Sequence, residues 1–158
     1  MNFRQWAACI CLICYAGVSL AGASVVVVSA LPAVSPQTSQ PAQFVTAEEL
    51  KAKLAKNERV TVIDVRSSSD LVASDSKIKG AIHVKVRKLQ ARLALPPLKN
   101  TPRDSEVVTY CACPNDEASI RAAEVLVNAG FKRVRVLKGG WVAWKKTNGQ
   151  VESKPRGL

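Results

Sequence analysis

Short apolar runs alternate with segments of helical periodicity along most of this chain. Four of the runs are rich in β-branched and aliphatic residues, and they predict strands at residues 59–65, 80–86 (with an entry turn), 107–110 and 133–137. The centre of the first run is almost entirely apolar, which is typical of a strand that is covered on both faces.

Helices are predicted between these strands. Thr46 and Glu49 form a capping-box pattern, and Leu50 and Leu54 give the following helix an apolar face. The longest helix is predicted over residues 118–129, where apolar side chains recur at helical spacing.

The remaining segments complete an α/β pattern. A polar loop is predicted at residues 67–79, a short helix at 88–95, and a last short helix that bears Trp141 and Trp144. Strands and helices that alternate at this spacing form right-handed βαβ units. We therefore predict an α/β fold with a central, mostly parallel sheet of about five strands and helices on both faces. In such sheets the ligand site lies beyond the carboxyl ends of the strands.

The first part of the chain has a different composition. Residues 5–47 contain no charged residue, and the apolar stretch at residues 6–34 follows Arg4. This is the arrangement of an export signal, with small-residue cleavage sites at residues 21–23 and 28–30. The stretch is also long enough to span a bilayer uncleaved. Residues 1–30 are therefore interpreted as a signal peptide or a membrane anchor, and both alternatives stay open.

Further boundaries follow from composition. Residues 31–43 are rich in Pro, Ser, Thr and Gln and predict an extended linker. Residues 44–152 form the predicted globular domain, and residues 153–158 form a polar tail. The domain is expected to be exported, either free in the periplasm or held at the membrane by an uncleaved N-terminal segment.

The chain is strongly basic, with 23 Lys and Arg against 12 Asp and Glu and a formal net charge of +11. Arg4 is the one charged residue before Glu48, so the rest of the chain carries 22 basic and 12 acidic residues, a net charge of +10. A basic domain favours anionic partners or small anions. Because the basic residues are scattered and only 5% of residues are aromatic, no nucleic-acid partner is predicted.

Cys111 follows a predicted strand and precedes the longest predicted helix. Backbone N–H groups at a helix N-terminus favour a thiolate over a thiol, and they can hold an anionic group on the sulfur. The alternative is that Cys111 is a small buried residue at the end of a core strand. Because a ligand site is expected at the strand ends, Cys111 is predicted to be an accessible, reactive thiol.

The other cysteines do not predict a scaffold or a metal centre. Three of the five lie in the apolar N-terminal segment: Cys9, Cys11 and Cys14. Cys111 and Cys113 together with the sole histidine, His83, are one ligand short of a structural zinc site. No metal and no cofactor are predicted.

Five short motifs occur in a defined order, at residues 62–66 (VIDVR), 78–82 (IKGAI), 107–111 (VVTYC), 130–131 (GF) and 136–144 (VLKGGWVAW). In this order they resemble the single-domain rhodanese family of sulfurtransferases. The resemblance implies a rhodanese-like fold and a catalytic Cys111 that carries a persulfide. The partners would then be a small-molecule or protein persulfide donor and a thiol acceptor.

The resemblance also implies an active-site loop that starts at Cys111 and continues through Ala112, Cys113, Pro114, Asn115, Asp116, Glu117, Ala118 and Ser119. In many members of the family this loop ends in an arginine that pairs with an oxyanion donor such as thiosulfate. Here Asp116 and Glu117 stand at that place, and the stretch from Cys111 to Ser119 is two residues longer. Since carboxylates oppose a dianion, we predict weak thiosulfate activity or a different donor.

Three side chains are expected near this loop. Arg121 either contacts a bound anion or lies on the helix surface. Asp64 and Arg66 brace the loop in the family, and Asp70 is a plausible ion-pair partner of Arg66. His83 is interpreted as a packing or surface residue.

Two other functions remain open. The domain could be a non-catalytic binding module on the rhodanese fold. Alternatively, Cys111 and Cys113 could form a Cys-x-Cys pair for thiol redox chemistry or for monovalent copper, which thiolates bind well.

Overall fold

The computed structural model describes residues 42–153. The predicted signal peptide or anchor (1–30), nearly all of the linker (31–43) and the tail beyond residue 153 lie outside the described residues, so these interpretations stay predictions. Within residues 42–153, no helix is both long and apolar enough to cross a membrane.

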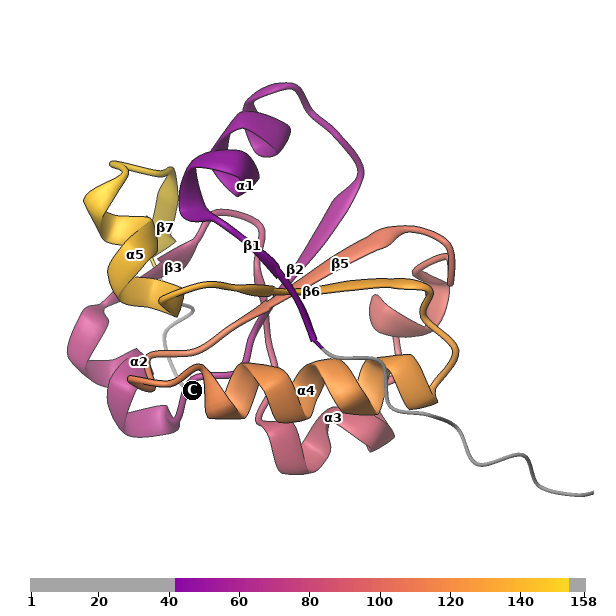
Figure 1. Cartoon of the computed structure of the whole chain (residues 1–158). Helices are drawn as coiled ribbons and strands as arrows, with labels where there is room; N and C mark the ends of the chain where they lie inside the picture. Colours follow the sequence, from indigo (N-terminus) through magenta and orange to yellow (C-terminus); the bar gives the residue numbers. More distant parts are fainter. Residues whose placement is uncertain (1–41, 154–158) are drawn as a thin grey trace, which may run out of the picture. The chain divides into compact units, whose positions relative to one another are not determined.

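A sheet of five parallel strands forms the centre of the domain (Figure 1), in the order β1-β6-β5-β2-β4. The strands are β1 (Gln43–Val45), β2 (Val60–Asp64), β4 (Ile82–His83), β5 (Glu106–Tyr110) and β6 (Arg133–Leu137). This confirms the predicted α/β fold with a parallel sheet of about five strands. Every residue of the central strand β5 is buried, because helices cover both faces of the sheet.

Four helices pack on the two faces (Figure 1). Helices α3 (Val86–Arg92) and α4 (Glu117–Asn128) lie on one face, and α1 (Ala47–Ala55) and α5 (Gly140–Lys146) lie on the other. Alternating side chains of β5 therefore enter different halves of the core. Val107 and Cys111 pack towards α3 and α4, whereas Val108 and Tyr110 pack towards α1 and α5.

The sequence signals for these helices are confirmed within one to three residues. Both halves of the predicted capping box form at the start of α1. The Glu49 N–H donates to Thr46 Oγ1 at 3.1 Å, and the Thr46 N–H donates to Glu49 Oε2 at 2.9 Å. A 3₁₀ turn, η1 (Leu98–Asn100), follows α3.

The polar loop predicted at residues 67–79 is wrong. This segment forms helix α2 (Ser68–Ser74) and strand β3 (Ser76–Ile78), which pairs antiparallel with β7 (Val151–Ser153). The Ser67 hydroxyl caps α2 by accepting a hydrogen bond from the Asp70 N–H, and Leu71 is the buried residue of the helix. The second, two-stranded sheet is held further by the ion pair of Lys77 with Glu152.

Candidate active site

Strand β5 ends at Tyr110, and Cys111 is the next residue. The loop that follows is shorter than predicted, because α4 already begins at Glu117. Glu117, Ala118 and Ser119 therefore belong to the first turn of the helix and not to the loop. Asp116 closes the loop in a left-handed conformation, with φ of 54°.

The Cys111 side chain is buried, and this corrects the prediction of an accessible thiol. Its relative exposure is 0%, and it lies in the same core cluster as Val65 and Val84. The reason is that position 111 continues the face of β5 that begins with Val107, and helices α3 and α4 cover that face. The Sγ atom is nevertheless not in purely apolar surroundings, because the Cys113 N–H donates to it at 3.3 Å. In the described conformation the Cys111 sulfur is therefore shielded from solvent and accepts a hydrogen bond from one backbone amide.

The second cysteine lies on the partly exposed side of the loop. Burial and the hydrogen bond with Cys111 raise the pKa of the Cys113 thiol, and the backbone amide of Ala118 lowers it by less. The first turn of α4 therefore acts electrostatically on Cys113. At neutral pH Cys113 is a protonated thiol, which is a weak nucleophile.

The two carboxylates after the loop are placed differently from each other. The buried Asp116 accepts the Gly139 N–H through Oδ2 at 2.9 Å, so it ties the loop to the start of α5. Glu117 lies on the surface of α4, where its carboxylate is 3.9 Å from Arg121 Nη1 and both side chains are more than 60% exposed. Arg121 is thus a helix-surface residue in this conformation.

A close backbone approach joins α5 to Cys111. The Trp141 N–H donates to the Cys111 carbonyl at 2.8 Å, and Gly140 adopts φ of 47°. A Cβ atom at Gly140 would lie 2.1 Å from the Cys111 carbonyl oxygen. Only glycine fits here without moving the backbone of the loop.

Gly140→Ala should therefore destabilise the fold by at least about 2 kcal/mol, because a left-handed residue acquires a side chain and that side chain clashes with the Cys111 carbonyl. Gly130→Ala is a matched control, since Gly130 also has a positive φ, of 89°, but nothing within 4 Å of the added Cβ. Gly130→Ala should destabilise the fold only because alanine is disfavoured in a left-handed conformation, by about 1 kcal/mol. Urea unfolding of both variants measures the difference, and equal losses would contradict the proposed clash.

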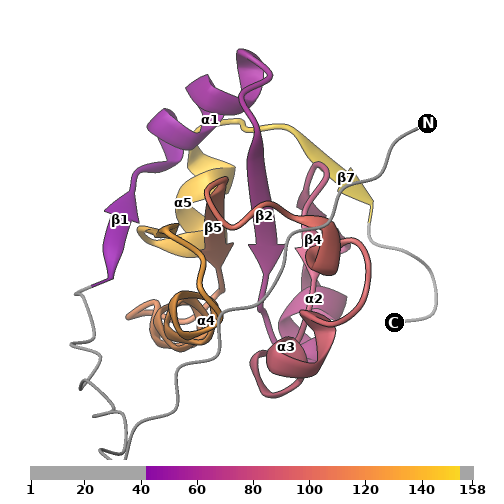
Figure 2. The same cartoon turned by 90° about the vertical axis from the view of Figure 1, so that its right-hand side faces the viewer.

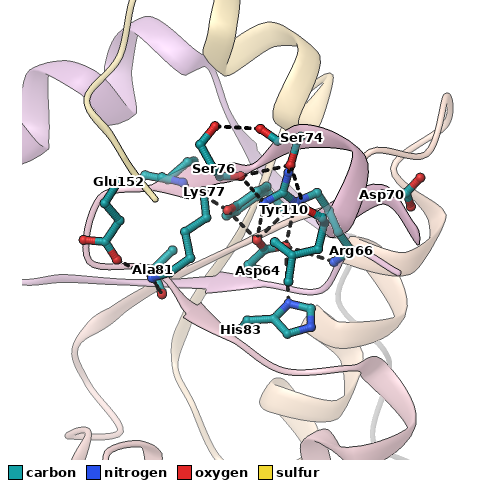
Figure 3. Close-up of polar contacts among 12 residues, drawn as sticks. Asp64, Arg66, Asp70, Ser74, Ser76, Lys77, Ala81, His83, Tyr110 and Glu152 are labelled. Carbon is teal, nitrogen blue, oxygen red and sulfur yellow. Dashed lines mark hydrogen bonds and ion pairs between the residues drawn. The ribbon is translucent and has the colours of Figure 1, made fainter. Parts of the chain in front are cut away.

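A buried polar network lies behind the loop (Figure 3). The Arg66 guanidinium binds both carboxylate oxygens of Asp64, with Nη2 at 2.7 Å from Oδ2, and it donates to Ser74 Oγ and to the Ser76 carbonyl. The Tyr110 hydroxyl donates to Asp64 Oδ2 at 2.8 Å. Figure 3 shows Asp70 apart from this group, and its carboxylate accepts a hydrogen bond from Ser67 instead. The predicted Arg66–Asp70 pair is therefore wrong.

The charges in this network keep the Asp64 carboxylate ionised and the Tyr110 hydroxyl protonated at neutral pH. Burial by itself raises the pKa of Asp64, but the His83 imidazole and the Arg66 guanidinium lower it by more, from 3.8 to about 2. Burial and the Asp64 carboxylate raise the pKa of Tyr110 well above its ordinary value, so the phenol keeps the proton that it donates. Arg66 also stacks over Trp141, with Cζ 4.4 Å from the ring centroid. These contacts fix Tyr110, the residue before Cys111, from one side of the sheet.

Sequence reasoning did not place His83 near this network. The pairing of β2 with β4 sets His83 opposite Asp64, and Nδ1 lies 3.8 Å from Asp64 Oδ1, which is too long for a hydrogen bond. Only the register between β2 and β4 places His83 beside Asp64, and the sequence does not reveal that register. Among residues 42–153, no group of three or more His, Cys, Asp or Glu side chains is arranged to hold a metal ion.

Comparison with known proteins agrees with this architecture. The family model described as "Rhodanese-like domain" matches residues 46–147. A sulfurtransferase of Allochromatium vinosum is 28% identical over 102 residues, which cover 65% of this chain and 87% of the relative. The crystal structure of the Alr3790 protein from Anabaena sp. is 32% identical with a TM-score of 0.59, covering 70% of this chain and 82% of that one. The BH2092 protein from Bacillus halodurans is 26% identical with a TM-score of 0.60, covering 71% and 77%.

Proposed function

Because this chain belongs to the rhodanese-like domain family, we propose that it is a sulfurtransferase in which Cys111 carries the transferred sulfur as a persulfide. The observation that carries the proposal is the position of Cys111 directly after the central strand β5, with a backbone N–H directed at Sγ. An amide donor stabilises negative charge on the sulfur, both in the thiolate and in the persulfide.

The reaction has two balanced steps. The Cys111 thiolate attacks the terminal sulfur of a donor R–S–SH, so a Cys111–S bond forms while the donor S–S bond breaks and the thiolate R–S⁻ leaves. An acceptor thiolate then attacks the terminal sulfur of the Cys111 persulfide and takes it as its own persulfide, which returns Cys111 as a thiolate. The sulfane sulfur moves at constant oxidation level, so the cycle needs no external oxidant or reductant.

The donor that we propose is a persulfide and not thiosulfate. A thiosulfate dianion needs a fixed cation beside the sulfur, ideally an arginine fork. The loop offers Asp116 at this place, and the nearest arginine of α4, Arg121, is directed to the helix surface, where it faces Glu117. Thiosulfate activity should therefore be weak. The uncharged, apolar N-terminal segment supports the further proposal that the domain acts outside the cytoplasm, in the periplasm or at the membrane.

One observation favours a second candidate, a non-catalytic binding module of the same fold. The Cys111 side chain is fully buried in the described conformation, so the reaction requires the loop at residues 111–116 to open. If the loop stays closed, the domain would act through its surface alone.

Intact-protein mass spectrometry separates the two functions. The full chain is incubated with glutathione persulfide, with thiosulfate, or with neither. Sulfurtransfer predicts a gain of one sulfur atom with the persulfide, mapped by proteolysis to the peptide that contains Cys111, and little gain with thiosulfate. A protein that gains no sulfur from any donor, although free thiols in the same mixture do, would establish the binding module instead.

A further inference from the structure

A basic pocket of about 240 Å³ lies beyond the carboxyl end of β4, between α2 and α3. Figure 2 shows these three elements together at one side of the sheet. Three cationic side chains line the pocket, Lys85, Lys88 and Arg92, and none of its lining residues is acidic. Leu71 and Val84 supply an apolar wall. The pocket therefore combines apolar surface with concentrated positive charge.

These three cations have no carboxylate partner among residues 42–153. In the part of the chain that the structure describes, none of the three has an acidic group within 4 Å, whereas the buried cations Arg66 and Lys77 are each paired with a carboxylate. Lys85 and Arg92 are half-buried, so solvent screens their charges less than those of fully exposed side chains. A pocket of this kind attracts an anion.

His83 is a further polar group in the wall of the pocket. Its side chain is only 10% exposed, and its buried Nδ1 has no hydrogen-bond partner in the described part of the chain. Buried polar groups are rarely left without a partner. The buried Nδ1 faces Asp64 Oδ1 at 3.8 Å (Figure 3), so it belongs to the Asp64 network, and the three cationic side chains carry the anion site.

Strand register sets the distance from this pocket to the sulfur. Tyr110 pairs with Asp64, and Asp64 pairs with His83, so Cys111 directly follows β5 and Val84 directly follows β4, with β2 between the two strands. Neighbouring strands are about 4.8 Å apart, which puts the backbones of Cys111 and Val84 about 10 Å apart. An extended chain advances about 3.4 Å per residue, so a ligand of about three residues spans this gap.

We propose that the pocket between α2 and α3 binds the carboxylate end of a small organic polyanion whose thiol end reaches Cys111. This inference rests on the proposed function and gives the donor a chemical class: a persulfide of about tripeptide size that carries two or more carboxylates. Lys85, Lys88 and Arg92 bind the carboxylates, and Val84 contacts the stem of the ligand. Sulfur donors without carboxylates do not use this site.

Binding is tested first, without any sulfur transfer. Reduced glutathione, its diethyl ester and inorganic phosphate are titrated into the full chain by calorimetry at low salt. We expect saturable binding of glutathione that weakens about tenfold in Lys88→Glu, since the charge of one of the three cations that line the pocket is reversed, and no binding of the ester. Lys146→Glu on α5 is the matched control: it makes the same charge change on an exposed side chain on the other face of the sheet, and it should leave affinity within about twofold. Phosphate that binds as tightly as glutathione would overturn the assigned ligand class.

Sulfur loading of Cys111 then separates this inference from the proposed function. At donor concentrations below saturation, Lys88→Glu should load about tenfold more slowly from glutathione persulfide and at an unchanged rate from the persulfide of the diethyl ester. If wild type and Lys88→Glu load equally fast from both donors, the pocket assignment is wrong while the sulfurtransferase proposal stands. If glutathione binds as expected but Cys111 never gains sulfur, the site stands and the sulfurtransferase proposal falls.

Discussion

Replacing Cys111 by serine should abolish sulfur loading and reduce the rate of sulfur transfer from a persulfide donor by on the order of 10³-fold or more. A serine hydroxyl at this position stays protonated at neutral pH and cannot form a persulfide. The substitution is nearly isosteric, so the buried site at the end of β5 should retain its packing. Formation of the acceptor persulfide measures the rate, and intact mass measures the loading.

Cys113→Ser is the matched control for this prediction. The raised pKa of Cys113 keeps it protonated, and its backbone N–H, which serine retains, is what contacts Cys111 Sγ. Loading of Cys111 should therefore persist within about threefold, because the substitution retains both the reacting thiol and the amide that contacts it. Loss of loading in Cys113→Ser with retention in Cys111→Ser would reverse the assignment, and loss in both with a Cys111–Cys113 disulfide in the wild type would favour the redox alternative.

Asp64→Asn should destabilise the fold by about 3–5 kcal/mol, which is the largest loss expected from a side chain outside the apolar core. Arg66 and Asp64 both have 0% side-chain exposure, so the substitution leaves a guanidinium buried without a counter-charge. It also removes the carboxylate that accepts the Tyr110 hydroxyl. Urea unfolding at neutral pH measures the loss, and Glu58→Gln, at the half-exposed ion pair with Lys53, should change stability by less than about 1 kcal/mol.

Two further measurements test the origin of this loss. Adding Arg66→Met to Asp64→Asn should recover part of the stability, because no unpaired charge then remains buried. The native pKa of Asp64, about 2, lies below its ordinary 3.8, so its stabilising effect is complete above about pH 4 and disappears as pH falls through 2. The difference between wild type and Asp64→Asn should therefore shrink over this range. A difference that is constant with pH would show that lost packing, and not lost charge, causes the destabilisation.

Local sequence signals predicted most of the regular structure correctly. Strands β2, β5 and β6 and helices α1 and α4 each contain a periodic apolar pattern, and Thr46 and Glu49 marked the start of α1. The fold class followed because strands and helices alternate, and a parallel sheet is the arrangement that buries both faces of such strands. The same pattern placed Cys111 at the end of a central strand.

Short elements whose partners are distant in sequence were not predicted. Strands β1, β3 and β7 have three residues each, and they are stable only because β6 pairs with β1 and because β3 and β7 pair with each other. Three residues are too few for a recognisable period. Helix α2 was missed because three of its seven residues are serine and it carries a single buried apolar residue, Leu71.

The sequence by itself determined the α/β architecture and the position of one cysteine between a strand and a helix. Both depend on the spacing of apolar residues within short segments, which local sequence reveals. Only the tertiary structure decided that Cys111 is closed off beneath α3 and α4, that Arg66 binds Asp64 and not Asp70, and that His83 lies beside the Asp64 carboxylate. The physical reason is that burial and charge pairing depend on which strands become neighbours. Strand order depends on how the whole domain packs, so no single segment of the sequence predicts it.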